Sequence, residues 1–241
     1  INENASLTSM FKGADLMQSN QGVSDTPSIF YFNTSVFTDK TTLQTAIDAW
    51  IEDPDAAKET YGEINDWDVS EISDFSSLFE DKSTFNSDIS NWDVSNGTNF
   101  SRMFYLASDF NQDIGNWDVS NGTDFAYMFS FAYDFNQDIG SWEVSSGEDF
   151  YYMFLLATNF NQDIGDWDVS KGNNFAYMFY EADSLNQDLR NWTVNEDALL
   201  TDMFYSADLM QSNQGVSDTP SMFYFNPYVF TDKTTLQTAI D

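Results

Sequence analysis

The sequence predicts an α/β fold: a right-handed solenoid in which short coils of chain stack around one continuous core. Tryptophan recurs at equal intervals of 25 residues, and such a period marks a stacked repeat architecture. Within each unit the apolar spacing changes from alternate residues to a helical stripe, which predicts one short parallel strand and one short helix per coil. The tryptophans that mark the six units are Trp67, Trp92, Trp117, Trp142, Trp167 and Trp192.

The strand is expected around the tryptophan of each unit. Trp117 and Val119 alternate with Asp118 and Ser120, so apolar and polar side chains would point to opposite faces. A row of tryptophans also suggests a surface for stacking sugars, but tryptophan in phase with valine and isoleucine favours the core. We therefore expect all six tryptophans to be buried.

The helix is expected to begin at Phe125, with Thr123 or Asp124 as its N-cap. Residues 136–138 (Asn-Gln-Asp) then turn the chain back toward the next strand. Such a coil is too small to close a core by itself and must stack on its neighbours. The apolar stripe of this helix comprises Phe125, Met128, Phe129, Ala132 and Phe135.

Residues 36–63 are predicted to form a helical N-terminal cap that covers the open end of the solenoid. Thr38 or Asp39 is the expected start of its first helix. Pro54 would open a second, shorter helix, which Gly62 would stop. The amphipathic face of the first helix comprises Leu43, Ala46, Ile47, Trp50 and Ile51.

A second, longer period divides the chain. Residues 1–48 recur with substitutions at residues 194–241, which is 193 positions later. We therefore expect the parent protein to repeat a block of 193 residues, of which this chain holds one block and an overlap. Residues 1–35 would close a preceding block, residues 64–211 would form the repeat solenoid, and residues 212–241 would be a linker and the start of the next cap.

The longer period also predicts a partner, namely the chain itself. Residues 1–35 carry apolar side chains spaced for burial, and burying each is worth roughly 1.5–3 kcal/mol. They can dock on the cap of their own chain, or on the C-terminal coil around Met203 and Phe204 of another copy. Docking on another copy is head-to-tail and gives a filament. We expect either such a filament or covalent tandem blocks.

The charge and composition exclude several functions. The 241 residues include 40 acidic and 8 basic side chains, no His and no Cys, for a net charge of −32. There is no basic surface to neutralise phosphates, which argues against nucleic acid and against anionic membranes. Without Cys there are no disulfides, thiol catalysts or thiolate metal sites. No apolar run approaches the ~20 residues of a membrane span.

The repeated unit resembles a known family. Its pattern, W-D-x-S…F-x-x-M-F-x-x-A-x-x-F-N-Q-D-I, is similar to the leucine-rich-repeat surface proteins of the BspA type, over roughly residues 36–211. The resemblance implies a leucine-rich-repeat-like solenoid with a non-enzymatic, extracellular role at the cell surface, in structure or adhesion. Where that family shows V-T-x-M after the serine, this chain has glycine, which suggests a turn with positive φ or a close backbone approach. These glycines are Gly97, Gly122, Gly147 and Gly172.

Two rows of acidic side chains are candidate cation sites. Adjacent strands lie about 4.8 Å apart, so a row of carboxylates repels itself unless a cation, a basic ligand or serine hydroxyls relieve it. Calcium prefers such oxygen ligands and is the cofactor candidate; hydrogen bonding of the aspartates to serine and backbone of adjacent coils is the structural alternative. The concave acidic row comprises Asp68, Asp93, Asp118, Glu143 and Asp168. The metal candidates are Asp88, Asp113, Asp138, Asp163 and Asp188.

Two further rows lie at the turn and on the outward face of the expected helix. Asn86, Asn111, Asn136, Asn161 and Asn186 are expected to form a ladder whose amides satisfy the loop backbone. Aromatic side chains in register on the helices suggest a contact surface for a protein or glycan, with partial burial between helices as the alternative. That surface comprises Tyr127, Tyr152, Tyr177, Phe131 and Leu155, with Leu156 nearby and with Arg102 and Asp202 at its two ends.

Three functions are consistent with these patterns. The first is a structural or adhesive module of a long extracellular surface protein or fibre, which binds protein or glycan partners. The second is a dedicated calcium- or glycan-binding module, and the third, more distant, is an acid-pair glycoside hydrolase. Because every carboxylate is a repeated copy and no unusual residue breaks the repeat, we expect no enzyme.

Overall fold

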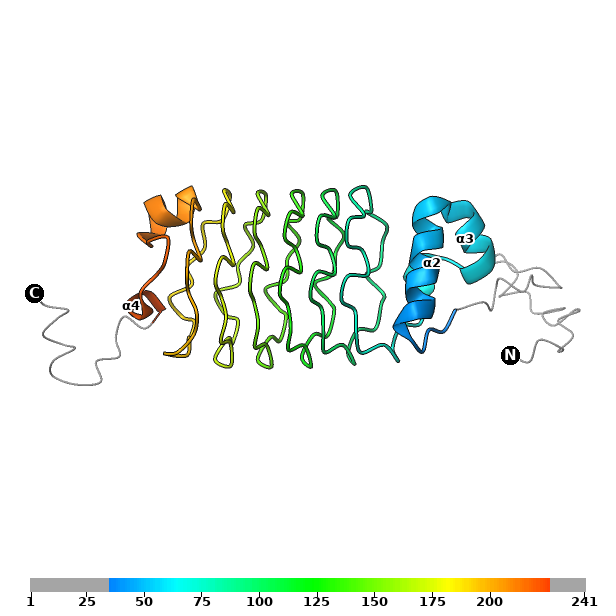
Figure 1. The fold of residues 1–241 in the computed structure, drawn as a ribbon, viewed down its shortest axis with the longest axis horizontal. Coiled ribbons are helices and arrows are strands. Elements are labelled where there is room, and N and C mark those ends of the chain that lie inside the picture. Colours follow the sequence, from blue (N-terminus) through cyan, green and yellow to red (C-terminus); the bar gives the residue numbers. More distant parts are fainter. Residues whose placement is uncertain (1–34, 226–241) are drawn as a thin grey trace, which may run out of the picture.

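In the computed structural model, which describes residues 35–225, successive units lie side by side along one long axis (Figure 1). Two helices, α2 and α3, close the stack at its N-terminal end. The docking segment and the start of the next cap fall mostly on residues 1–34 and 226–241, outside the described residues, so the head-to-tail partner stays a prediction. The other helical elements are η2 (Ile64–Asp66, 3₁₀), η3 (Met210–Gln214, π) and α4 (Met222–Phe225).

The N-terminal cap has the two predicted helices. α2 (Lys40–Glu52) has Asp39 as its N-cap, whose carboxylate accepts a hydrogen bond from the backbone N–H of Thr42 at 3.0 Å. α3 (Pro54–Tyr61) has proline at its start and ends at Gly62, whose φ of 81° suits glycine. The buried face of α2 comprises Leu43, Ala46, Ile47 and Trp50, and Ile51 is half-buried.

The repeats are built from β-turns. Between residues 67 and 206, all of them described, there is no helix and no strand longer than a single bridge, so the strand and helix predicted for each coil are wrong. The backbone N–H of Met128 donates to the carbonyl of Phe125, and the next such turn runs from Phe129 to Ala132, both at 3.1 Å. Tyr127 and Phe131, each third in its turn, have the positive φ that type II turns require.

Turns replace the helix because they leave alternate N–H groups pointing along the stack. In a helix these groups would bond within the unit. Here the backbone N–H of every second residue donates to a carbonyl of the following unit, so each unit satisfies the backbone of its neighbour. Four such bonds between two central units run from Phe100 to Asp124, Arg102 to Ala126, Phe104 to Met128 and Leu106 to Ser130, at 2.8–3.0 Å.

Single parallel bridges also join the units, just before the first phenylalanine of each. They were expected around the tryptophan, but only Asp68 of the first unit forms a bridge there, to Val36 of the cap. The carboxylate of Asp124 accepts the N–H of Ala126 at 2.9 Å, a local turn contact instead of the expected helix N-cap. The chain of bridges runs Asp74, Asn99, Asp124, Asp149, Asn174 and Leu199.

The predicted inward faces are confirmed. All six tryptophans are at most 4% exposed, and the whole stripe from Phe125 to Phe135 is buried. The indole N–H of Trp142 donates to the carbonyl of Ile114 in the unit before it, at 3.0 Å, and the same bond recurs along the stack. Phenylalanine rings of successive units stack face to face, as in Phe104 on Phe129 at 5.6 Å between centroids. The core is therefore a set of aromatic columns that run through every unit.

Candidate contact surface

The predicted acidic row lies outside this core, and its aspartates are relieved locally. The carboxylate of Asp118 accepts the backbone N–H of Ser120 at 3.0 Å, and Asp168 makes the same contact with Ser170. These bonds lie within one unit and do not reach adjacent coils. Hydrogen bonds from the Ser120 and Ser170 hydroxyls, chiefly, hold the pKa of each aspartate below its usual value. The aspartates of the row are thus explained by turn structure.

The metal candidates also serve turns. The carboxylates of Asp113, Asp138 and Asp163 each accept the backbone N–H two residues on, at 2.9–3.0 Å. Asp188 pairs with the guanidinium of Arg190, whose hydrogen bond is the main cause that lowers the pKa of Asp188 to about 2. Among residues 35–225 there is no cluster of three or more His, Cys, Asp or Glu side chains able to hold a metal ion. The structure therefore does not assemble these aspartates into one centre.

The asparagine ladder forms as predicted. The side-chain oxygen of Asn136 accepts the backbone N–H of Asn161 at 2.9 Å, and the side-chain amide of Gln162 donates to it at 2.8 Å. The same backbone contact recurs along the row from Asn86 to Asn186. One amide per unit thus holds the turn of the next unit in register.

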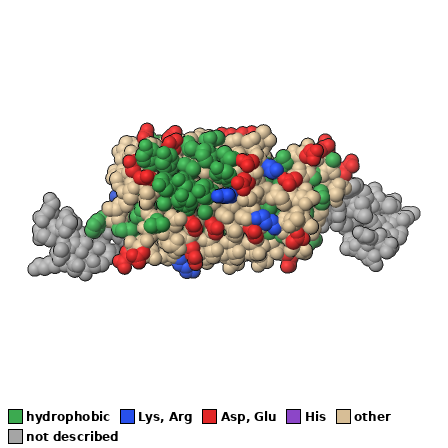
Figure 2. Space-filling view, viewed as in Figure 1, with side chains coloured by type: hydrophobic (Ala, Val, Ile, Leu, Met, Phe, Trp, Pro, Cys, Tyr) green, Lys and Arg blue, Asp and Glu red, His purple; other side chains and the backbone are tan. Residues whose placement is uncertain are grey.

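The predicted contact residues come together on one surface. Hydrophobic side chains gather in a single patch over the units nearer the C-terminal end (Figure 2). Within it lies an open hollow of about 700 Å³. We call this the aromatic hollow; it is lined by Tyr127, Phe131, Tyr152, Leu155, Leu156, Tyr177, Tyr180, Asp202 and Tyr205. The alternative holds in part: the predicted contact residues are half-buried between neighbouring units, although the units are built from turns and not from helices.

The centre of the hollow is a ladder of stacked tyrosines. The rings of Tyr127 and Tyr152 lie 5.0 Å apart between centroids, and those of Tyr152 and Tyr177 lie 4.7 Å apart, at 13° to each other. The guanidinium of Arg102 lies over the ring of Tyr127, 5.1 Å from its centroid. A second pair, Tyr180 and Tyr205, stacks at 4.7 Å. The faces between neighbouring rings are thus used within the surface, and the ring edges remain for a partner along the ladder.

The hydroxyls of Tyr127 and Tyr152 stay protonated at neutral pH. Partial burial, above all, raises the pKa of Tyr127 and of Tyr152 above the usual value, and the neighbouring Tyr151 raises both further. Each hydroxyl can therefore donate as well as accept a hydrogen bond. The surface combines apolar rings with neutral polar groups, a composition typical of protein interfaces.

The ladder stands on strained backbone. Tyr127, Tyr152 and Tyr177 have φ of 57–60°, in the left-handed region that Gly, Asn and Asp occupy most readily. For other residues that conformation costs roughly 1–2 kcal/mol. The fold itself does not require tyrosine here, because the same position of the first unit holds Ser77 at φ 59°. Because every unit has a positive φ at this position, the strain belongs to the fold, and what distinguishes this surface is the repetition of tyrosine in three successive units.

Two residues of the hollow were not predicted from the sequence. Tyr180 and Tyr205 occupy one position of successive units, which earlier units fill with Glu80, Tyr105 and other side chains. The sequence varies at this position of the repeat, whereas the core positions stay the same from unit to unit. That difference could have identified it as a surface position, because only positions that maintain the fold need to repeat. The expectation that nothing unusual breaks the repeat is wrong at these outward positions.

Comparisons with known proteins place the repeats in a family. The model of a family described as Mycoplasma protein of unknown function, DUF285, matches residues 51–158 and again residues 123–219. No curated protein and no solved structure matches the chain. In the part of the chain that the structure describes, no helix is long and apolar enough to span a membrane.

Proposed function

The chain belongs to this DUF285 family of tandem-repeat proteins, and we propose that it is a non-enzymatic module that binds a protein partner through the aromatic hollow. The observation that carries the proposal is the tyrosine ladder: three half-buried rings in register on left-handed backbone, which border an open hollow beside other aromatic side chains. Contiguous apolar surface that solvent reaches in this way marks interaction sites. The aromatic columns of the core supply the rigid support beneath it.

A protein partner fits this surface better than a glycan. Sugars stack on open aromatic faces, but Tyr152 has a ring on each side, Tyr127 at 5.0 Å and Tyr177 at 4.7 Å. What the ladder offers is ring edges, hydroxyls and the adjacent apolar side chains of Phe131 and Leu155. Apolar contacts ringed by hydrogen-bonding groups are the usual anatomy of a protein–protein interface.

The setting that we propose is the cell surface, within a longer array. The resemblance of the units to BspA-type proteins supports an extracellular, adhesive role and a leucine-rich-repeat-like right-handed solenoid, here with turns in place of strand and helix. The recurrence of residues 36–48 at 229–241 supports covalent tandem blocks. Antibody labelling of intact cells, compared with permeabilised cells, tests the location, and labelling only after permeabilisation would contradict it.

The binding role can be tested with a peptide library that stands in for the natural partner. A random library displayed on phage is selected on immobilised protein, with counter-selection on the Tyr152→Asn variant. Asparagine tolerates the positive φ at this position, so the variant keeps the backbone and breaks the ladder. We expect enriched peptides that bind the unchanged protein and lose most of their affinity for the variant.

The control for this selection is Tyr61→Asn, which changes a tyrosine of the cap, far from the hollow in the chain. Enriched peptides should bind this variant as they bind the unchanged protein. Peptides that bind Tyr152→Asn equally well, or no enrichment after several rounds, would contradict a binding role for the hollow. Thermal unfolding of each variant shows whether it is folded before it is used.

A further inference from the structure

One position of the repeat runs along the whole ladder. Its occupants in successive units are Ser77, Arg102, Tyr127, Tyr152, Tyr177 and Asp202. All six share the positive φ of the turn, so the side chains leave the backbone in the same direction. Three tyrosines thus form the middle of the row, with a cation before them and a carboxylate after them.

The N-terminal end of the ladder shows what an aromatic face takes on this surface. The guanidinium of Arg102 lies 5.1 Å from the centroid of the Tyr127 ring. A cation over the face of a tyrosine is attracted by the negative charge of its π-system, and the planar guanidinium suits the contact well. At this end of the ladder, the exposed face of the Tyr127 ring is therefore covered by an arginine of the protein itself, Arg102.

The C-terminal end of the ladder differs. The next unit places Asp202 after Tyr177, and the aspartate side chain is too short to cover the ring as Arg102 covers Tyr127. Both residues line the aromatic hollow together with Tyr180 and Tyr205. The Thr219 hydroxyl lies within hydrogen-bond distance of the Asp202 carboxylate, at 3.3 Å, and orients it. An aromatic face and a carboxylate thus border the same open space.

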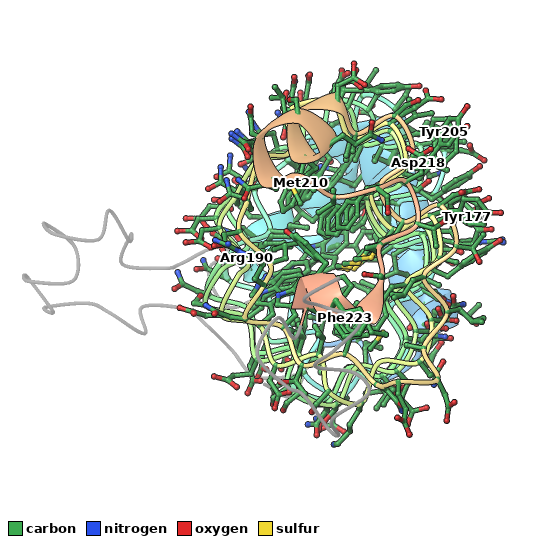
Figure 3. All side chains as sticks on the ribbon, turned by 90° about the vertical axis from the view of Figure 1, so that its left-hand side faces the viewer. Tyr177, Arg190, Tyr205, Met210, Asp218 and Phe223 are labelled. Carbon is green, nitrogen blue, oxygen red and sulfur yellow. The ribbon has the colours of Figure 1, made fainter. Side chains whose placement is uncertain are left out.

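We propose that this end of the hollow, between Tyr177 and Asp202 with Tyr180 and Tyr205 around it, binds a cationic side chain of the partner protein, the guanidinium of an arginine. Figure 3 shows Tyr177 and Tyr205 on the same side of the stack, with Arg190 on the other side. A partner arginine stacked on Tyr177 and paired with Asp202 repeats the contact of Arg102 with Tyr127 and adds an ion pair. The inference rests on the proposed binding role of the hollow and specifies its ligand.

The charge of the protein favours the same ligand. The sequence has forty acidic and only eight basic side chains, so the protein attracts a cationic partner from a distance. Next to Tyr180, which lines the hollow, Glu181 adds negative charge, and this charge contributes, after burial, to the raised pKa of Tyr180. An anionic partner group would meet repulsion here.

The test is a titration with two short peptides, acetyl-Gly-Arg-Gly-amide and the same peptide with citrulline, which has the shape of arginine without its charge. Aromatic resonances of Tyr177 and Tyr205 are followed by NMR. A cation–π contact together with an exposed ion pair corresponds to about five- to tenfold in affinity, so the arginine peptide is expected to bind that much more tightly. The corresponding lysine peptide should bind more weakly than arginine, since an ammonium does not stack.

Two variants and a matched control localise the effect. Asp202→Asn should weaken the arginine peptide about two- to fivefold, as loss of an exposed ion pair does. Tyr177→Asn, which suits the φ of 58°, should reduce the preference for arginine over citrulline to the about two- to fivefold that the ion pair with Asp202 supplies. Asp166→Asn removes the same charge at an exposed residue outside the hollow and should leave the affinity nearly unchanged.

Equal affinity for the arginine and citrulline peptides, or an equal effect of Asp202→Asn and Asp166→Asn, would overturn the arginine site. The binding role of the hollow has its own readout in the peptide selection. Selected peptides that depend on Tyr152 but lack basic residues would uphold the binding role and remove the cation site. Enrichment of arginine among them would support both.

Discussion

At the scale of the residue, four units have glycine two residues after the serine that follows Trp-x-Val, and a neighbouring phenylalanine ring requires it. Gly147 does not have a positive φ; instead, a Cβ at this position would clash with Cζ of Phe150 and lie 3.0 Å from the carbonyl oxygen of Val144. Of the two reasons that the sequence suggested for these glycines, the structure supports close approach. The departure from the V-T-x-M pattern thus makes room for a core phenylalanine.

Gly147→Ala is therefore expected to destabilise the protein by about 1–3 kcal/mol, as overpacking of a tight core does. Ser146→Ala, one residue earlier at a half-buried position, is the control and should change stability little. The free energy of unfolding in urea measures both. Equal stabilities for the two variants would show that the Phe150 ring moves aside without cost.

The ion pair of Asp188 and Arg190 makes a pH-dependent contribution. The pKa of Asp188 is about 2 in the folded protein, below the ordinary value of about 3.9. A lowered pKa means that the carboxylate stabilises the fold above pH ~4 and loses this contribution as the pH falls from ~4 to ~2. In Arg190→Gln the pKa of Asp188 should rise toward the ordinary value. Carboxyl NMR titration measures the shift, and an unchanged pKa would contradict the assignment to Arg190.

At the scale of the element, the sequence predicted α2 and failed on the repeats for a physical reason. In α2 the apolar face, the Asp39 cap and Pro54 after its end all specify a helix. In the repeats the spacing of Phe125, Met128 and Phe129 fits a helix. Consecutive β-turns, the first from Phe125 to Met128 and the next beginning at Phe129, bury the same residues. The spacing of apolar residues indicates which side chains are buried. It does not indicate the hydrogen-bond partner of each backbone N–H, because that partner lies in the neighbouring unit.

The candidate site was predictable to the same extent. The tyrosines in register at 127, 152 and 177 were visible as a surface row, because register follows from the period alone. The stacking of their rings and the participation of Tyr180 depend on the direction in which left-handed residues project. That direction follows from the turns, which the sequence did not predict.

The asparagine ladder is an element whose contribution can be measured. Asn136→Ala removes the acceptor for the backbone N–H of Asn161 and for the amide of Gln162. Because the site is exposed and water can replace the acceptor, a loss of about 0.5–1.5 kcal/mol is expected. Asn136→Asp keeps an acceptor oxygen and should retain most of the stability. If Asn136→Asp destabilises as much as Asn136→Ala, the contact with the backbone N–H is not the stabilising one.

At the scale of the whole molecule, stability passes from unit to unit. Each unit contacts its neighbours through stacked rings and backbone hydrogen bonds. The total free energy of unfolding is therefore close to a sum of contributions from the units and from the interfaces between them. The two ends are covered differently: α2 and α3 pack on the first unit, and α4 packs on the last. Phe225 of α4 is 1% exposed and stacks on Trp192 at 6.3 Å between centroids.

Phe225→Ala is expected to remove roughly 3–5 kcal/mol of packing at this end alone. The backbone N–H of Phe204, which donates to the carbonyl of Asp218 at 2.8 Å, should then exchange faster with deuterium. Amides of the central unit around Trp117 should keep their protection, because two intact units, those of Trp142 and Trp167, separate them from the lesion. Phe223→Ala, in the same short helix but 49% exposed, is the matched control and should leave both regions protected. Equal loss of protection at Phe204 and at Trp117 would mean that the stack unfolds as one cooperative body, and the additive account of its units would then be wrong.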